Sequence, residues 1–278
     1  MIQKLKITVL IENHAGREDL LAEHGLSLWI EADNRCLLFD TGQSGAFVDN
    51  AGMLGIDLGD TEAVVLSHGH YDHGGGLAEA PERFHGVPLY VHPAAFDGKY
   101  SVTPEQGGRY NGAAFGGLEA IRAAIPGTVL TEQPTEILPG VWATGTIPRR
   151  HVYEVTGGPF YRDAEGTTPD PLMDDQALYI ETEQGVVVLL GCAHAGMVNT
   201  LDYVADLTGR KSIAALIGGM HLIRASEGRM KKTLAALRMY DVRRIGPCHC
   251  TGGEAIERMK GEFGERVIEP AGGAVIEF

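Results

Sequence analysis

The sequence has no tract of basic residues that could bind nucleic acid. Its 23 lysines and arginines are outnumbered by 37 aspartates and glutamates, which gives a formal net charge of −14. Binding to a phosphate backbone needs a concentrated positive surface, so we expect no nucleic-acid partner. A small anionic substrate is not excluded, because a bound metal ion or a single arginine can reverse the local field.

Long apolar runs and a cysteine framework are missing as well. No apolar run approaches the ~20 residues of a membrane helix. Residues 1–6 show neither the apolar core nor the cleavage site of a signal peptide. Four cysteines in 278 residues do not indicate a disulfide scaffold. We therefore expect a cytoplasmic protein with no membrane partner, and the sequence leaves homo-oligomerisation open.

The remaining composition suits a globular α/β protein. Hydrophobic residues make up 44% of the chain, which is enough for a sizeable core. The length allows one large domain or two small ones. The segments at about 94–139 and 146–174 are less regular than the rest. Segments this long in a compact domain usually carry function or are disordered, and we expect both to be covering-loop insertions.

A cluster of metal-ligating residues follows a predicted buried strand. Residues 63–66 form an apolar, β-branched run. Three histidines and an aspartate follow within six positions, as His68, His70, Asp72 and His73. Neutral imidazoles and carboxylates are ligands for zinc, iron or manganese. Alternate residues of an extended loop share a side, so His68 and His70 predict one metal position and Asp72 with His73 a second. A histidine-rich surface loop is the alternative interpretation.

Three more histidines occupy the same kind of junction. An apolar strand pattern precedes each of His194, His221 and His249, and glycines lie nearby. Unrelated core histidines would not share this context, so we expect these strand ends to meet at one site. Three glycines separate the first cluster from the next helical pattern, which predicts that this helix begins at Leu77.

The motif His-Gly-His-Tyr-Asp-His at residues 68–73 resembles the signature of the metallo-β-lactamase superfamily. Segments 37–45, 190–196 and 218–222 resemble the branch that includes the dihydropterin–ribofuranosylaminobenzene phosphate synthase of the methanopterin pathway. The resemblance extends over nearly the whole chain. It implies an αββα sandwich of two mixed β-sheets flanked by helices, formed by a single domain over residues 1–278.

The resemblance also implies one or two divalent metal ions at the edge between the sheets. Zinc is the expected metal, with iron or manganese as alternatives. His194 would join His68 and His70 at the first ion, and Asp72, His73 and His249 would hold the second.

Two further roles follow from the resemblance. His221 stands where many members have a bridging aspartate or cysteine, so we expect it to be a ligand or an acid–base residue. Asp72 and His221 are the candidate catalytic residues. Asp40 would support the ligand loop through hydrogen bonds.

Two residues are candidates for contacts with the substrate. Arg149 belongs to an Ile-Pro-Arg segment that closes over the active site in the resembled branch. A guanidinium can hold a phosphate with two parallel hydrogen bonds, although a solvated surface arginine is the alternative. Asn13, in the turn after the first predicted strand, is the second candidate. Cys248 and Cys250 flank His249, and on a strand both would face away from it into packing.

These observations predict a metal-dependent enzyme that acts on a phosphorylated or otherwise anionic small molecule. The first hypothesis is a hydrolase of a phosphoester, thioester or lactone that uses metal-bound hydroxide. The alternative is a transferase like the resembled synthase, in which an acceptor displaces diphosphate. A diiron redox protein is a third hypothesis, although such relatives have extra carboxylate ligands and usually a flavin domain. A metal-binding protein without turnover is the fourth.

Overall fold

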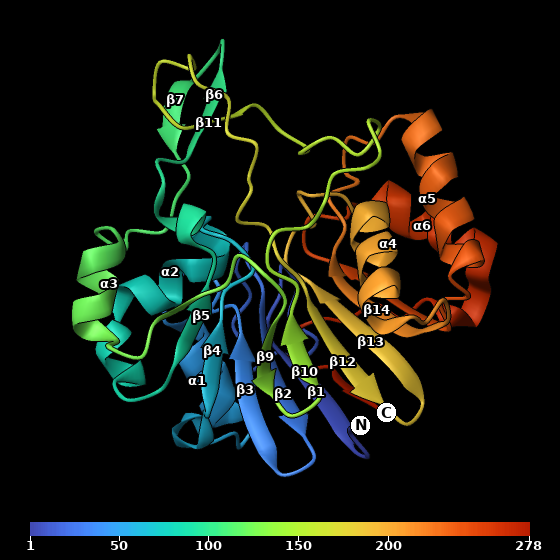
Figure 1. The fold of residues 1–278 in the computed structure, drawn as a ribbon, viewed down its shortest axis with the longest axis horizontal. Coiled ribbons are helices and arrows are strands. Elements are labelled where there is room, and N and C mark those ends of the chain that lie inside the picture. Colours follow the sequence, from blue (N-terminus) through green and yellow to red (C-terminus); the bar gives the residue numbers. More distant parts are fainter.

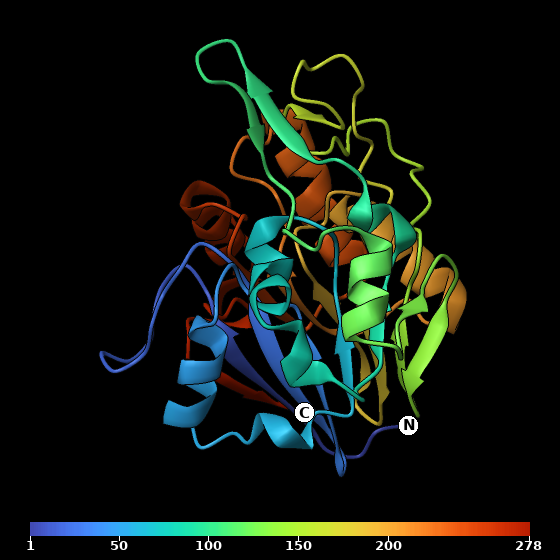
Figure 2. The same cartoon turned by 90° about the vertical axis from the view of Figure 1, so that its left-hand side faces the viewer.

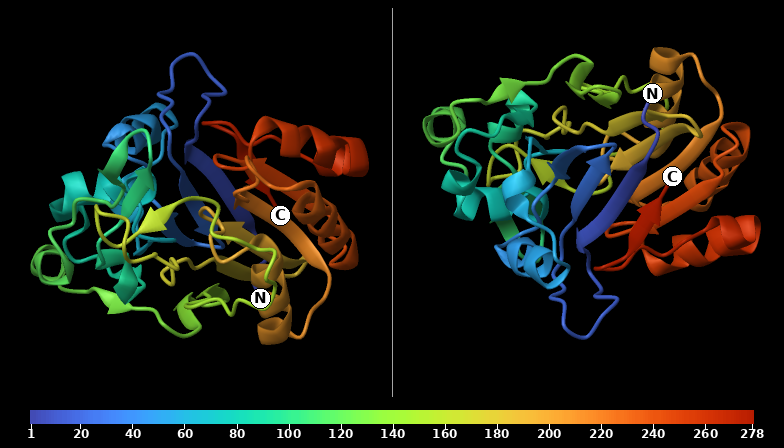
Figure 3. Two further views of the ribbon diagram at one scale, coloured as in Figure 1. Left: turned by 90° about the horizontal axis from the view of Figure 1, so that it is seen from above. Right: turned by 90° about the horizontal axis from the view of Figure 1, so that it is seen from below.

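Two β-sheets pack face to face, and helices cover their outer faces (Figure 1). The computed structural model describes all 278 residues. Views from above and below show the sheets enclosed between α1–α3 on one side and α4–α6 on the other (Figure 3). This arrangement confirms the predicted αββα sandwich of mixed sheets. None of the helices has the length and the apolar character needed to cross a bilayer.

The first sheet has seven strands in the order β16-β1-β2-β3-β4-β5-β8. They are β16 (Val275–Glu277), β1 (Leu5–Ile11), β2 (Ser27–Ala32), β3 (Arg35–Phe39), β4 (Ala63–Val65), β5 (Leu89–Val91) and β8 (Val129–Leu130). The second sheet has six strands in the order β15-β14-β13-β12-β10-β9. They are β15 (Arg244–Cys248), β14 (Ile213–Gly219), β13 (Gly185–Leu190), β12 (Leu178–Thr182), β10 (Val141–Ala143) and β9 (Thr135–Leu138).

The helices alternate with strands in each half of the chain. They are α1 (Ala46–Met53), α2 (Tyr71–Glu79), α3 (Leu118–Ala124), α4 (Met197–Thr208), α5 (Glu227–Met239) and α6 (Gly253–Phe263). When parallel strands are joined through helices, their carboxyl ends lie at the same edge of the sheet, and so do the loops that follow them. The strands β3, β4 and β5 are parallel in the first sheet, and β13, β14 and β15 are parallel in the second. Loops after these strands therefore gather at one edge of the sandwich.

The central strands are apolar almost throughout because both of their faces are covered. All seven residues of β14 are buried, and so are the last five of β13. One core of 25 residues, including Ile7, Val65, Leu189 and Ile217, lies between the sheets. Two further apolar clusters lie beneath the helices on each side. Each fully buried aliphatic side chain contributes ~1.5–3 kcal/mol, so this packing holds the strand ends in fixed positions.

The start of α2 differs from the prediction. The helix begins at Tyr71 rather than at Leu77, so it includes Asp72, His73 and all three glycines. Glycine is a poor helix former, but here it allows close packing. A Cβ at Gly75 would lie 2.3 Å from the carbonyl oxygen of Gln43, so a larger residue could not occupy this position without a shift.

A small third sheet rises above the two layers, and both chain ends lie on the opposite side of the molecule (Figures 1 and 2). It contains β6 (Tyr100–Thr103), β7 (Gly107–Tyr110) and β11 (Phe160–Tyr161), in the order β11-β6-β7. Both segments predicted to be covering loops contribute to it, since β6 and β7 lie within residues 94–139 and β11 within 146–174. They meet on the side of the sandwich where the histidine junctions lie.

Candidate metal centre

The loops that follow β4, β13, β14 and β15 each deliver a histidine to one place between the sheets. Left-handed backbone conformations mark the turns after β13, β14 and β15, with φ of 53° at Ala193, 46° at His221 and 52° at His249. Asp40, directly after β3, has a φ of 59°. A non-glycine residue in this region costs of order 1–3 kcal/mol and persists where its surroundings hold it. Four such residues at one edge indicate that the surrounding structure holds their side chains in place at the cost of backbone strain.

The first group of donor atoms, which we call the histidine triad, contains His68, His70 and His194. The Nε2 atom of His68 lies 3.0 Å from Nδ1 of His70, and the ring of His194 lies 4.8 Å from that of His68 between centroids. All three side chains are buried, and Nε2 of His70 and of His194 has no hydrogen-bond partner. Burial lowers the pKa of His70 to about 3 and holds the pKa values of His68 and His194 well below the usual range. The three rings are therefore neutral, as metal ligands must be.

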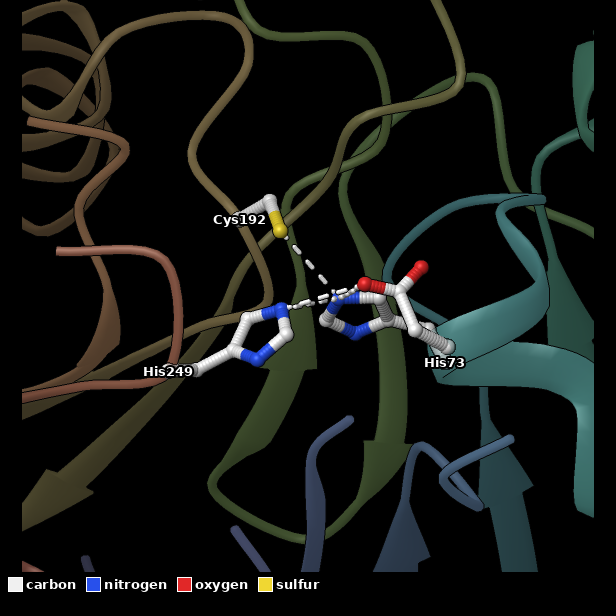
Figure 4. A group of neighbouring side chains, drawn as sticks. His73, Cys192 and His249 are labelled. Atoms are coloured by element: carbon white, nitrogen blue, oxygen red, sulfur yellow. Dashed lines mark hydrogen bonds and ion pairs between the residues drawn. The ribbon is translucent and has the colours of Figure 1, made fainter. Parts of the chain in front are cut away.

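The second group, which we call the mixed cluster, contains Asp72, His73, His249 and Cys192. Figure 4 shows the imidazoles of His73 and His249 and the thiol of Cys192 pointing toward one another. The Nε2 atom of His73 lies 3.2 Å from Nε2 of His249 and 3.2 Å from Sγ of Cys192. The Nε2 atom of His249 lies 3.3 Å from Oδ2 of Asp72. All four donor atoms lie within 4.8 Å of one another.

These distances fit bound metal ions. Two nitrogen ligands 2.0–2.1 Å from a tetrahedral ion are ~3.3 Å apart, close to the separations in both groups. The unpartnered Nε2 of His194 is a second indication, because buried polar atoms in proteins normally have a partner. The thiol of Cys192 lies within 4.8 Å of donor atoms of both groups. The residues present therefore fit two neighbouring divalent ions, and they leave the identity of the metal open.

Further residues hold these candidate ligands in orientation. The carboxylate of Asp40 accepts hydrogen bonds from the Ser67 amide and hydroxyl, each at 2.7 Å, and lies 2.7 Å from Nδ1 of His73. Burial lowers the pKa of His73, but the carboxylates of Asp40 and Asp72 outweigh it and raise the value to about 9. These contacts are those expected of a residue that supports the ligand loop.

Asn13 and Thr156 orient two more of the rings. The side chain of Asn13 lies 3.0 Å from Nδ1 of His249 through Oδ1 and donates to the His249 carbonyl oxygen at 3.1 Å. The Thr156 carbonyl oxygen lies 2.7 Å from Nδ1 of His194. In His249 and His194 these contacts occupy Nδ1, which leaves Nε2 of each ring for the mixed cluster and the histidine triad, respectively.

Cys250 is placed differently from the prediction. Strand β15 ends at Cys248, which packs in the core between the sheets, and the left-handed turn at His249 then interrupts the alternation of side chains. Cys250 consequently lies beside the metal centre, with Sγ, Sγ of Cys192 and a ring nitrogen of His221 within 4.8 Å of one another. The prediction that Cys250 faces away from the site is wrong for this reason. Cys192 was not predicted as a ligand, although its position two residues before His194 is a usable signal.

Arg149 lies at the base of the covering segment and bonds to the protein itself. Its Nη1 donates to the His194 carbonyl oxygen at 2.9 Å, and its Nη2 donates to the carbonyl oxygens of Leu172, at 3.0 Å, and Pro171. Arg149 thereby ties the 146–174 segment to the loop after β13 that carries His194. Contact between Arg149 and a substrate stays a prediction, and these bonds favour a structural role.

The donor groups open into a pocket of about 360 Å³. Its lining includes His70, Asp72, His194, His221 and His249, together with Asn13 and the two cysteines Cys192 and Cys250. Phe160 from β11 forms part of the wall, with its ring centroid 5.0 Å from that of His70 and 5.2 Å from that of His194. This volume is within the usual range for a small-molecule site.

His221 and His24 complete the pocket. The ring of His221 lies 4.5 Å from that of His194, and its Nδ1 has no hydrogen-bond partner. His24 comes from the long loop between β1 and β2 and places Nε2 3.2 Å from Oδ2 of Asp72. No sequence pattern pointed to His24, because it belongs to no motif and becomes a neighbour only through folding.

Comparison with known proteins agrees with this geometry. The sequence profile of the metallo-β-lactamase superfamily matches residues 21–249, and the chain belongs to that superfamily. The chain is 29% identical over 290 aligned positions to the 7,8-dihydropterin-6-methyl-4-(β-D-ribofuranosyl)-aminobenzene-5′-phosphate synthase of Methanocaldococcus jannaschii. That alignment covers 100% of this chain and 98% of the relative.

Two solved structures show the same architecture. Tm1679, described as a metal-dependent hydrolase of the β-lactamase superfamily, is 33% identical and has a TM-score of 0.84 over 99% of each chain. Zinc-bound PqqB of Methylobacterium extorquens has a TM-score of 0.59 over 98% of this chain and 99% of its own. At 15% identity, the second likeness shows the fold alone.

Proposed function

We propose that this protein is a metal-dependent enzyme that acts on a phosphorylated or otherwise anionic small molecule, with hydrolysis of a phosphoester, thioester or lactone as its reaction. The observation that carries the proposal is the pair of donor groups at the floor of one pocket, together with the buried and unpartnered Nε2 of His194. A buried nitrogen without a partner is unfavourable unless it binds something. The likeness to Tm1679 over the whole chain supports a hydrolase.

The proposed ligands are the histidine triad for one ion and Asp72, His73 and His249 for the other, with Cys192 as a further donor. When bound, such ions lower the pKa of a coordinated water to ~7 and polarise a phosphoryl or carbonyl oxygen. The chain itself orients the rings through Asp40, Asn13 and the Thr156 carbonyl oxygen. Phe160 packs beside the rings of His70 and His194 and forms an apolar wall above them.

His221 and Asp72 are the residues that we propose for proton transfer. His221 lines the pocket, and its unpartnered Nδ1 is free to accept or donate a proton if the ring is not a ligand. Asp72 already contacts His24 and His249, so it could pass a proton between the metal cluster and the pocket.

A diphosphate-displacing transferase is the second candidate, and the synthase relative favours it because the match covers both chains almost completely. In that reaction the acceptor forms a bond to a methylene carbon, and the bond from this carbon to the diphosphate oxygen breaks. The acceptor proton is released and the diphosphate leaves as an anion. The aromatic wall at Phe160 and Tyr71 suits a flat ring system.

Metal analysis tests the shared part of both candidates. Protein purified without added metal should contain between one and two equivalents of zinc, iron or manganese. His70→Ala should lose most of the metal from the first position, whereas Asp72→Ala should mainly empty the second. Protein that remains metal-free after incubation with these ions would disprove the proposal, and equal losses in both variants would show that the two-position assignment is wrong.

Product analysis separates the two reactions. A hydrolase should cleave phosphodiesters, thioesters or lactones with water alone and leave penicillins and cephalosporins essentially intact. A transferase should release diphosphate, detected by phosphorus NMR, only when an aromatic acceptor is present. Diphosphate release that does not depend on the acceptor would rule out transfer, and acceptor-dependent release without hydrolysis of any ester would rule out the hydrolase.

A further inference from the structure

A second, smaller pocket of about 150 Å³ lies directly behind His221. Its lining consists of Val155, Thr156, Gly157, Gly158, His221, Arg224 and Arg229. His221 also lines the metal pocket, so the two spaces share this residue.

Arg229 is the buried cation of this pocket. It is 4% exposed, and its Nη2 has no hydrogen-bond partner. Its Nε lies 3.4 Å from Oε1 of Glu154 without forming a hydrogen bond, and its Nη1 donates to the Val155 carbonyl oxygen at 3.3 Å. A buried guanidinium with unused donors is unfavourable unless an acceptor satisfies them. The carboxylate of Glu154 neutralises the charge of Arg229, but Nε and Nη2 of Arg229 still lack hydrogen-bond acceptors.

Arg224 supplies the second cation. It is exposed and lines the pocket together with Arg229. The only carboxylate paired with either arginine is that of Glu154, which lies beside Arg229, since Glu227 at the start of α5 pairs with Arg258 of α6. Two guanidinium groups therefore face one carboxylate, which leaves a local positive charge on a chain whose net charge is −14. Arginine forks match the geometry of phosphate oxygens.

The loop opposite the arginines comes unusually close to His221. A Cβ at Gly157 would lie 1.9 Å from Cδ2 of His221, so only glycine allows this approach. Gly157 and Gly158 thus keep the wall of the pocket free of side chains. Their segment begins at Thr156, whose carbonyl oxygen contacts His194 of the histidine triad, so the pocket wall and the metal site are parts of one structure.

We propose that this arginine pocket binds a phosphate monoester group of the substrate, at the end remote from the atoms that react at the metal centre. The inference rests on the proposed function for its link to catalysis, but anion binding by the pocket stands without it. The substrate would then carry two functional ends, a reacting group over the metals and a terminal phosphate beside Arg224 and Arg229. Contacts to a remote phosphate can stabilise the transition state by fixing the orientation of the reacting group.

Selenate, a tetrahedral dianion with an anomalous X-ray signal, tests where anions bind. Crystals of the metal-loaded protein soaked in selenate should show a selenium peak within hydrogen-bond distance of Arg224 and Arg229, separate from the metal peaks. Selenium only at the metal ions or on the outer surface would overturn the proposal. This readout needs no activity, so a peak at the arginines in a protein that turns over no ester would reject the proposed function and retain the pocket.

Sulfate titration of the metal-loaded protein, followed by calorimetry, tests the residues. Arg224→Ala should weaken sulfate binding roughly tenfold or more, the effect expected for loss of a charged hydrogen bond. The control Arg122→Ala, an exposed arginine on α3, should leave the affinity unchanged. Equal affinities for the wild-type protein and Arg224→Ala would contradict the inference.

Arg229→Lys separates binding from loop support, because lysine keeps the charge beside Glu154 and loses the fork. We expect weaker sulfate binding with an unchanged melting temperature. A lowered melting temperature with unchanged sulfate affinity would show that Arg229 only supports the loop at Val155, and this would refute its proposed role. With a hydrolysed ester in hand, Arg224→Ala should raise the KM of a terminally phosphorylated ester and leave that of its unphosphorylated counterpart unchanged.

Discussion

Replacement of Gly75 by alanine should destabilise the protein, although the position is in the middle of a helix. Alanine is favoured over glycine by ~0.8–1.0 kcal/mol in a helix interior. A Cβ at Gly75, however, would lie 2.3 Å from the oxygen and 2.7 Å from the carbon of the Gln43 carbonyl, whereas ordinary contacts begin at 3.4 Å. Backbone atoms cannot rotate away, so α2 or the segment at Gln43 must move by about 1 Å. Overpacking of this kind costs ~1–3 kcal/mol.

The net expectation for Gly75→Ala is a loss of up to about 2 kcal/mol, together with weaker metal binding because α2 carries Asp72 and His73. Gly261 in α6 is the matched control, since a Cβ there would have no neighbour within 4 Å. Gly261→Ala should gain up to ~1 kcal/mol. Urea unfolding of the metal-free protein measures both free energies of unfolding. If both variants are stabilised, the packing argument for the glycines of α2 is incorrect.

Three further predictions use other contacts. Lys99→Met should lower the free energy of unfolding by ~3–5 kcal/mol in urea, because buried Asp170 and Asp174 lose their ion pairs; a change as small as the ~1 kcal/mol or less of an exposed pair would contradict this. Arg149→Ala should slow turnover of phosphorylated and uncharged esters alike if the residue holds the covering segment, and a loss confined to the phosphorylated ester would restore its predicted substrate contact. The metal-free protein should lose stability as the pH falls below about 6.5, because the unfolded chain then binds protons that the buried histidine triad does not. Each histidine of the triad, with its lowered pKa, reduces the free energy of unfolding by ~1.4 kcal/mol for each pH unit below this value. Asp175 acts in the opposite direction and offsets the effect of one histidine, because burial raises its pKa to about 7. Thermal unfolding between pH 7 and 5 checks the sign, and a melting temperature that rises on acidification would refute it.

The sequence alone predicted the strand ends that carry histidine, and its resemblance to the superfamily implied the fold. Apolar runs before His68, His194, His221 and His249 are local patterns, and they mark buried strands followed by turns. Ligand chemistry is also local, since a histidine offers the same nitrogens wherever it lies. The six ligand positions expected for two metal ions could therefore be predicted from residue type and position, and the structure brings all six side chains together.

Only the tertiary structure decided how neighbouring residues are used. The glycines after His73 predict a loop by their helix propensity, yet they are helical, and the close approach of Gln43 to Gly75 explains why glycine occupies that position. Cys250 faces the site because one left-handed residue, His249, reverses the alternation expected of a strand. Arg149 and Arg229 look alike in sequence, but carbonyl groups surround the first, whereas the second keeps an unused donor beside a pocket. Propensity and spacing are properties of a short segment, whereas the partners of a side chain depend on segments that meet only when the chain folds.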